Sequence, residues 1–274
     1  MRALFLTILC ALTLQAQDAR EIVKRSVDRD ARNFARFKDY TFQQLTEQKM
    51  LDKRGQVSSL ETELNDVLIL AGRPYYRQLE RDGKLLSEKE AQKEQQKLDR
   101  EAAKRAGESE RTRARYERVR LEERAFAREI PDAFTFKLLG EERIDGLPVW
   151  KIQAEPKPGF KPRDRRAGAF KNVRGTLWID QAGYQWVKAD IDVIGTISWG
   201  WFVLRIPPGA KIEFSQTRVN DEVWLPKQVH IRADAKLGLI KTFRADVAIS
   251  YRNYRKFGSD SQILDVQEVG TPPK

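Results

Sequence analysis

The segment RGTLWIDQAGYQWVKADIDVIGTISWGWFVLRIPP, residues 174–208, joins two strand patterns through a turn and then enters a stretch rich in Trp, Phe and Gly. In the second pattern, Val187, Ala189, Ile191 and Val193 alternate with mostly charged residues. Alternation with a period of two predicts a strand with one dry and one wet face. The segment therefore predicts an antiparallel sheet that is packed on one side only.

The same alternation recurs over residues 211–219, 223–233 and 239–252. Short turns between these segments indicate neighbouring antiparallel strands, and their apolar face requires a covering layer of helices. Residues 18–37 have the apolar spacing of an amphipathic helix that can supply such a cover. The predicted fold class is α+β, with a curved antiparallel sheet covered by helices.

The N-terminus has the pattern of a secretory signal. A short positive start precedes the charge-free stretch ALFLTILCALTL, residues 3–14, and cleavage is expected after Ala16. Loss of residues 1–16 removes Cys10, the only cysteine, so the mature chain is expected to have no disulfide, no thiolate nucleophile and no Cys-ligated metal. We therefore expect export to the periplasm, as a free protein or one peripheral to a membrane.

Residues 17–258 are predicted to form one domain, followed by a loose tail at 259–274. Within the domain, residues 87–130 are predicted to be a charged helical insertion, opened by a capping box of Ser87 and Glu90. Its first half has almost no apolar stripe and predicts a solvated helical arm. Its second half offers a few apolar side chains and predicts a helix that rests on the body. The arm either binds a partner protein or is a charged insertion with little function.

The order of these patterns resembles a known superfamily. An N-terminal amphipathic helix is followed, after the helical insertion, by GTLWIDQAGYQWVKADIDV (175–193), VWLPKQVHIRA (223–233) and VAISYRNYRKF (247–257). The chain in this respect resembles the periplasmic lipoprotein-carrier superfamily, which includes LolA, LolB and RseB. The resemblance implies an unclosed half-barrel whose concave face, lidded by helices, holds acyl chains. It carries over no individual ligand-binding residue.

Candidate catalytic residues are few. The only histidine, His230, is expected on the polar strand face with neither an acid nor a nucleophile beside it. Asp190 and Asp192 share a strand face, where paired carboxylates can cleave glycosides or bind Ca²⁺, but the adjacent Lys188 favours plain ion pairing. We predict that the protein is not an enzyme and uses no cofactor and no metal.

The apolar run at residues 194–208 has two interpretations. It is either a core strand or a hydrophobic lip at the mouth of an acyl cavity, where Trp residues suit a half-wet position. The residues predicted to contact acyl chains, in the cavity or the lip, are Val187, Ile191, Trp199, Trp201, Phe202, Phe214, Val229, Phe243 and Val247.

Positive charge is the remaining signal. The chain carries 51 basic and 40 acidic residues, a net charge of +11. An exported protein rarely meets nucleic acid, so anionic lipid headgroups or acidic envelope polymers are the expected partners, unless the protein is merely basic. The residues predicted to face a membrane surface, all in the loop at 157–174, are Lys161, Arg163, Arg165, Arg166, Lys171 and Arg174.

Three functions follow from these patterns. The leading hypothesis is a non-enzymatic carrier or chaperone for lipid or lipoprotein acyl chains. The alternative is an envelope sensor or adaptor that binds a protein through the charged arm. A hydrolase acting through Asp190 and Asp192 is the most distant of the three.

Overall fold

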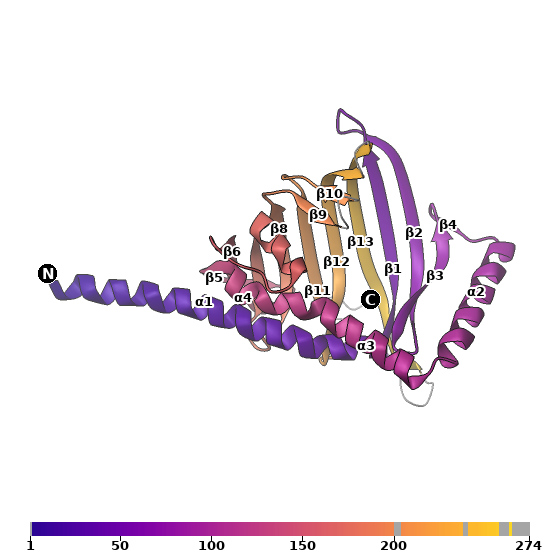
Figure 1. Ribbon diagram of the computed structural model, residues 1–274, viewed down its shortest axis with the longest axis horizontal. Helices are drawn as coiled ribbons and strands as arrows, with labels where there is room; N and C mark the ends of the chain where they lie inside the picture. The colour runs from indigo at the N-terminus through magenta and orange to yellow at the C-terminus, as the bar shows by residue number, and fades with distance from the viewer. Residues whose placement is uncertain (1, 200–203, 238–240, 258–262, 265–274) are drawn as a thin grey trace.

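The computed structural model describes residues 2–199, 204–237, 241–257 and 263–264. Its main feature is one large antiparallel sheet with helices gathered on one side (Figure 1). The strands along the sheet, in spatial order, are β4 (Lys84–Leu85), β3 (Arg73–Arg81), β2 (Val57–Leu70), β1 (Tyr40–Leu51), β13 (Lys241–Phe257), β12 (Val223–Leu237), β11 (Lys211–Val219), β8 (Trp186–Val193), β7 (Val173–Asp180), β6 (Leu147–Pro156) and β5 (Phe134–Ile144).

Three short strands lie off this path. They are β9 (Ile197–Trp199), β10 (Leu204–Ile206) and β14 (Ile263–Leu264). Strand β10 pairs with β9 and β12, and β14 pairs with the end of β13, so two residues of the predicted tail are held by the sheet. The described strands at the two edges, β4 and β5, do not pair with each other. The α+β fold with an unclosed sheet is therefore confirmed.

The helices are α1 (Arg2–Arg36), α2 (Glu88–Ala106), α3 (Glu110–Ala125) and α4 (Ile130–Ala133), with 3₁₀ turns η1 (Phe37–Asp39), η2 (Phe126–Glu129) and η3 (Arg165–Asn172). Figure 1 shows α1 and α3 crossing one end of the strands, while α2 lies beside β3 at the far edge. Among the described residues, no helix has the length and apolar character that a membrane crossing requires.

Helix α1 covers one half of the sheet. Its side chains Ala19, Ile22 and Val23 are at most 8% exposed and pack on apolar residues of β5, β6, β7 and β8. Burying each large apolar side chain contributes about 1.5–3 kcal/mol. Arg20 also donates to the carbonyl of Pro131 and pairs with Asp132 at 2.6 Å, which fixes α1 to α4. The helical cover predicted from residues 18–37 is thus present over this half.

A strand bulge corrects one part of the predicted alternation. Ile179 pairs with Trp186 and Trp178 with Lys188, so Val187 has no partner in β7. An extra residue of this kind reverses the alternation on the bulged strand. Val187 packs with Val149, Trp178 and Trp224, and the described residues of this cluster include none from α1. Its predicted place beside Ala189 and Ile191 on the face under α1 is therefore wrong, and Trp186 packs there instead.

The charged insertion forms two helices, as the sequence predicts. Ser87 and Glu90 form the capping box at the start of α2, and none of the residues in α2 is fully buried. The arm is nevertheless held at its far end. The Arg105 side chain, 12% exposed, donates to the carbonyls of Leu70, Arg73 and Pro74 in the turn between β2 and β3. The prediction of a freely solvated arm therefore applies to the start of α2 and not to its end.

Candidate functional site

Two rows of side chains cross the middle of the sheet on the face that carries α1. Residues directly opposite each other in an antiparallel sheet project from the same face. The strand registers align the first row as Ile191, Ile212, Ile231 and Val247. They align the second row as Ala189, Phe214, Val229 and Ile249. We call these eight residues the apolar strip.

Both rows continue from the strip into the half of the sheet under α1. The first reaches Ala154 and Phe136 through Gly175, and the second reaches Leu177 and Ile152. Gly175 is required here, because a Cβ at this position would lie 2.4 Å from the carbonyl oxygen of Asp190. The strip and the core beneath α1 are therefore one continuous surface.

Burial changes along each row. Under α1, Ile152 is 0% exposed and Leu177 is 6% exposed. In the strip, Ala189 is buried and Ile191 is half-buried against the α1 core. The other six residues are half-buried and belong to none of the clusters found among the described residues. Figure 1 shows none of the helices of the described residues over the upper parts of β12 and β13. Helices therefore cover the apolar face only in part.

Polar residues limit the strip at its other side. In the next strand, β1, Gln48 lies opposite Val247 and Thr46 opposite Ile249. In β2 the rows end at Glu61 and Glu63, which are both exposed. The strip thus spans β8 to β13, about 14 Å at the usual strand spacing of about 4.8 Å. It is bounded by the α1 core on one side and by polar side chains on the other.

The opposite face of the same strands is charged. Asp190 pairs with Lys188 at 2.8 Å, and Asp192 lies 3.7 Å from Arg174 and 3.9 Å from Lys211. These contacts match the ion pairing predicted for the two carboxylates. Arg174 and Lys211 lie directly opposite Asp192 on the two neighbouring strands, so these contacts join strands of the sheet.

The histidine lies on the same charged face. His230 Nε2 is 2.8 Å from Asp246 Oδ1, and Arg232 binds the other oxygen of Asp246. Burial opposes ionisation of Asp246, but its hydrogen bond to His230 and the charges of His230 and Arg232 outweigh burial and lower the pKa of this carboxyl. The expectation that no acid lies beside His230 is therefore wrong, because the pairing of β12 with β13 brings Asp246 to it.

The predicted acyl-contacting residues are distributed unequally. Ile191, Phe214, Val229 and Val247 come together in the strip, and Val187 lies in the cluster with Trp178. Trp199 in β9 and Phe243 in β13 lie on described backbone, but their side chains fall outside the described set, as do Trp201 and Phe202 entirely. The lip therefore stays a prediction.

Sequence reasoning did not include Ile212 in the site. Ile231 and Ile249 lie within the alternating segments at 223–233 and 239–252, but neither was predicted as a site residue. The alternation within each strand indicates which residues share a face, but the alignment between strands, which joins residues 15 to 25 positions apart into rows, appears only in the sheet register. A prediction of how these four strands align would have found all three residues.

The predicted membrane-facing residues lie in a loop that is anchored to the body. The carboxylate of Glu129, 5% exposed, accepts the backbone N–H groups of Arg163 and Asp164 at 2.8 and 2.7 Å. Arg163, Arg166 and Arg174 have acidic partners. Lys161, Arg165 and Lys171 are exposed. The loop thus presents basic side chains to solvent, and its backbone is held to the body at Arg163 and Asp164.

Comparison with known proteins gives matches to solved structures. No protein-family model matches the chain, and no curated protein matches it. A DUF1329 family protein from Desulfovibrio piger matches at 12% identity and a TM-score of 0.34, covering 88% of this chain and 93% of that one. A LolA superfamily protein from Nitrosomonas europaea matches at 9% identity and a TM-score of 0.30, covering 88% and 94%.

The MucA/MucB complex of Pseudomonas aeruginosa also provides a match, at 12% identity and a TM-score of 0.25, covering 88% of this chain and 100% of that one. The superfamily that the sequence resembles is therefore among the structures matched. At these identities and TM-scores the likeness concerns the course of the chain alone.

Proposed function

We propose that the protein is an exported, non-enzymatic carrier or chaperone that binds lipid or lipoprotein acyl chains on the apolar strip. The observation that supports this proposal is the partial cover of one continuous apolar face. Ile152 and Leu177 are buried under α1, but Val229 and Ile249 in the same row are not. A soluble protein gains by covering such a surface, and a hydrocarbon chain is a suitable cover.

The energy available on the strip is adequate for a carrier. Burial of one methylene contributes about 0.8 kcal/mol, so about ten methylenes on the strip would contribute about 8 kcal/mol. A gain of about 8 kcal/mol corresponds to a micromolar Kd. Immobilisation of the chain reduces this gain, so the expected affinity is weaker than micromolar, which still allows the protein to hold an acyl chain and to release it.

Carrier function also agrees with the ion-paired state of the polar side chains. Asp190, Asp192 and His230, the candidates for hydrolysis, lie on the charged face of strands whose other face carries the strip. A hydrolase of acyl esters would require them near the bound chain. Export to the periplasm rests on the predicted signal at residues 1–16.

The alternative, a sensor or adaptor that binds a protein, is favoured by one observation on the arm. Tyr116, Val119 and Leu121 of α3 are 47%, 40% and 52% exposed. Exposed apolar side chains on one helix are typical of a surface that contacts a partner. This function would use α3, on which the strip does not depend.

Native mass spectrometry of the mature protein purified from the envelope fraction tests the proposal. A carrier is expected to retain lipid mass adducts that disappear after delipidation. An adaptor is expected to appear without lipid and in complex with a protein. An adduct-free monomer that takes up no added phospholipid or fatty acid would contradict the carrier function.

A further inference from the structure

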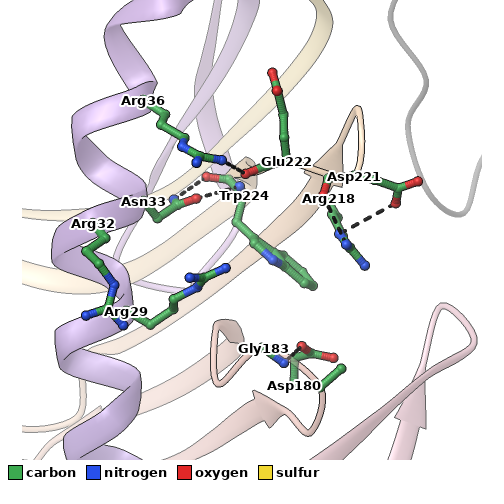
Figure 2. Close-up of a pocket in the computed structure, with 11 residues that line it drawn as sticks. Arg29, Arg32, Asn33, Arg36, Asp180, Gly183, Arg218, Asp221, Glu222 and Trp224 are labelled. Atoms are coloured by element: carbon green, nitrogen blue, oxygen red, sulfur yellow. Dashed lines mark hydrogen bonds and ion pairs between the residues drawn. The ribbon is translucent and has the colours of Figure 1, made fainter.

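A cavity lies apart from the strip, where α1 passes the turns at the ends of the strands. It has a volume of about 280 Å³ and is lined by Arg29, Arg32 and Arg36 of α1 together with Arg218 and Trp224 of the sheet. Figure 2 shows the side chain of Arg29 reaching from α1 toward the ring of Trp224. We call this cavity the arginine pocket.

The arginine pocket is built on a fixed frame. Asn33 Nδ2 donates to the carbonyl of Trp224 at 2.7 Å, and Asn33 Oδ1 accepts the N–H of Trp224 at 2.7 Å (Figure 2). This reciprocal pair joins α1 to the start of β12. Arg29, Asn33 and Arg36 recur at helical spacing and therefore share one face of α1. That face is distinct from the one that buries Val23 in the core.

The acidic residues that line the arginine pocket are engaged elsewhere. Asp180 Oδ2 accepts the N–H of Gly183 at 2.5 Å within its own turn. Asp221 lies 3.5 Å from Arg218. None of these contacts neutralises an arginine of α1.

Glu222 is held by two groups outside the cavity. Lys256 Nζ lies 2.5 Å from Glu222 Oε1, and Tyr40 donates to the same oxygen at 2.5 Å. The hydrogen bond from Lys256 and then that from Tyr40 lower the pKa of this carboxyl. Its backbone carbonyl accepts from Arg36 of α1 at 2.9 Å. The acids therefore leave positive charge on the α1 side of the cavity.

Arg29 and Arg32 supply that charge. Within the part of the chain that the structure describes, neither side chain has a hydrogen bond or an ion pair, and both are exposed. The negative end of a helix attracts cations only within its last turn. Arg29 lies seven residues before the end of α1, so the negative end of the helix does not stabilise its charge. Two guanidinium groups beside a partly open cavity are the donors that a phosphate group binds in bidentate form.

We infer that the arginine pocket binds the phosphate group of an anionic ligand through Arg29 and Arg32, with Trp224 as the flat apolar wall. The phosphate belongs either to a lipid headgroup or to a small soluble molecule. The site does not depend on acyl binding to the strip, because the two are built from different residues.

The test uses the full mature chain and two double variants. Arg29→Gln with Arg32→Gln removes the two pocket charges, and Gln has a helix propensity close to that of Arg. Lys89→Gln with Lys93→Gln removes two exposed charges of α2 and is the matched control. Thermal unfolding confirms that all three proteins are folded. Binding of inorganic phosphate is followed by phosphorus NMR line broadening, and binding to vesicles by sedimentation.

The vesicles contain phosphatidylglycerol in phosphatidylcholine, or phosphatidylcholine alone. We expect the pocket variant to bind about ten- to hundredfold more weakly, the loss typical of one or two charge-assisted hydrogen bonds, and the control to bind as wild type. A loss with phosphatidylglycerol vesicles assigns a lipid headgroup, and a loss with phosphate alone assigns a soluble ligand. Equal binding by both variants in both assays would overturn the inference.

Discussion

Two isoleucines in the same sheet face provide a direct comparison of covered and uncovered surface. Ile152 in β6 is 0% exposed beneath α1, and Ile231 in β12 is a half-buried member of the strip. Replacing each with Ala removes the same three carbon atoms. The two substitutions are chemically identical. The difference between their losses of unfolding free energy therefore measures how completely each side chain is covered by other residues.

The expected magnitudes differ by about a factor of two or more. In a closed core, Ile→Ala costs about 2–5 kcal/mol, since the lost transfer energy is joined by a cavity term. At Ile231 the space opens to solvent, so no enclosed cavity remains and only part of the transfer energy is lost, about 1–2 kcal/mol. A change of 1 kcal/mol shifts Tm by about 2–4 °C in a chain of this size.

Differential scanning calorimetry of ligand-free protein gives both values. We expect Ile152→Ala to lower Tm by roughly 10 °C, and Ile231→Ala by roughly 2–8 °C. Urea unfolding should rank the variants in the same order. Equal losses would show that the strip is packed as tightly as the core, and the argument from partial cover would then fail.

Two further predictions concern the insertion and the basic loop. Arg105→Gln removes the donors to the turn between β2 and β3, so hydrogen exchange of that turn should accelerate about tenfold, the effect of roughly 1.4 kcal/mol. Lys104→Gln, at a neighbour that is 72% exposed, should have no effect, and equal exchange in both variants would show that the arm is not held there. Hydrogen bonds from Arg166 lower the pKa of Asp164 from 3.8 to about 2, so this carboxylate stabilises the fold above about pH 4 and the contribution is lost as the pH falls toward 2. The difference in Tm between wild type and Asp164→Asn should therefore shrink over that range, and a constant difference would exclude this role.

The strands and the first turn of the insertion were predictable because their signals are local. Alternation marks β7, β8 and β11 within a few residues of their ends, and Ser87 with Glu90 marks the start of α2. These features depend on residues at most four positions apart.

Other features depend on distant contacts and were not predictable. The bulge at Val187 depends on how β8 aligns with β7, which a regular period cannot encode. The contacts of Arg105 and Glu129 join segments more than 30 positions apart. The arginine pocket likewise requires α1 to lie against the turn before Trp224, 191 positions from Asn33.

The central claim is that the apolar strip binds acyl chains, and the most direct measurement is the affinity of the delipidated protein for a fluorescent palmitate analogue. Ile231→Asn places a polar group in the strip, and Leu121→Asn makes the same type of change at an exposed position of α3. We predict that wild type and Leu121→Asn bind equally, and that Ile231→Asn binds about ten- to hundredfold more weakly, since an unpaired polar group against hydrocarbon costs about 1–3 kcal/mol. Absence of binding by the folded wild type, or equal binding by Ile231→Asn, would contradict the account.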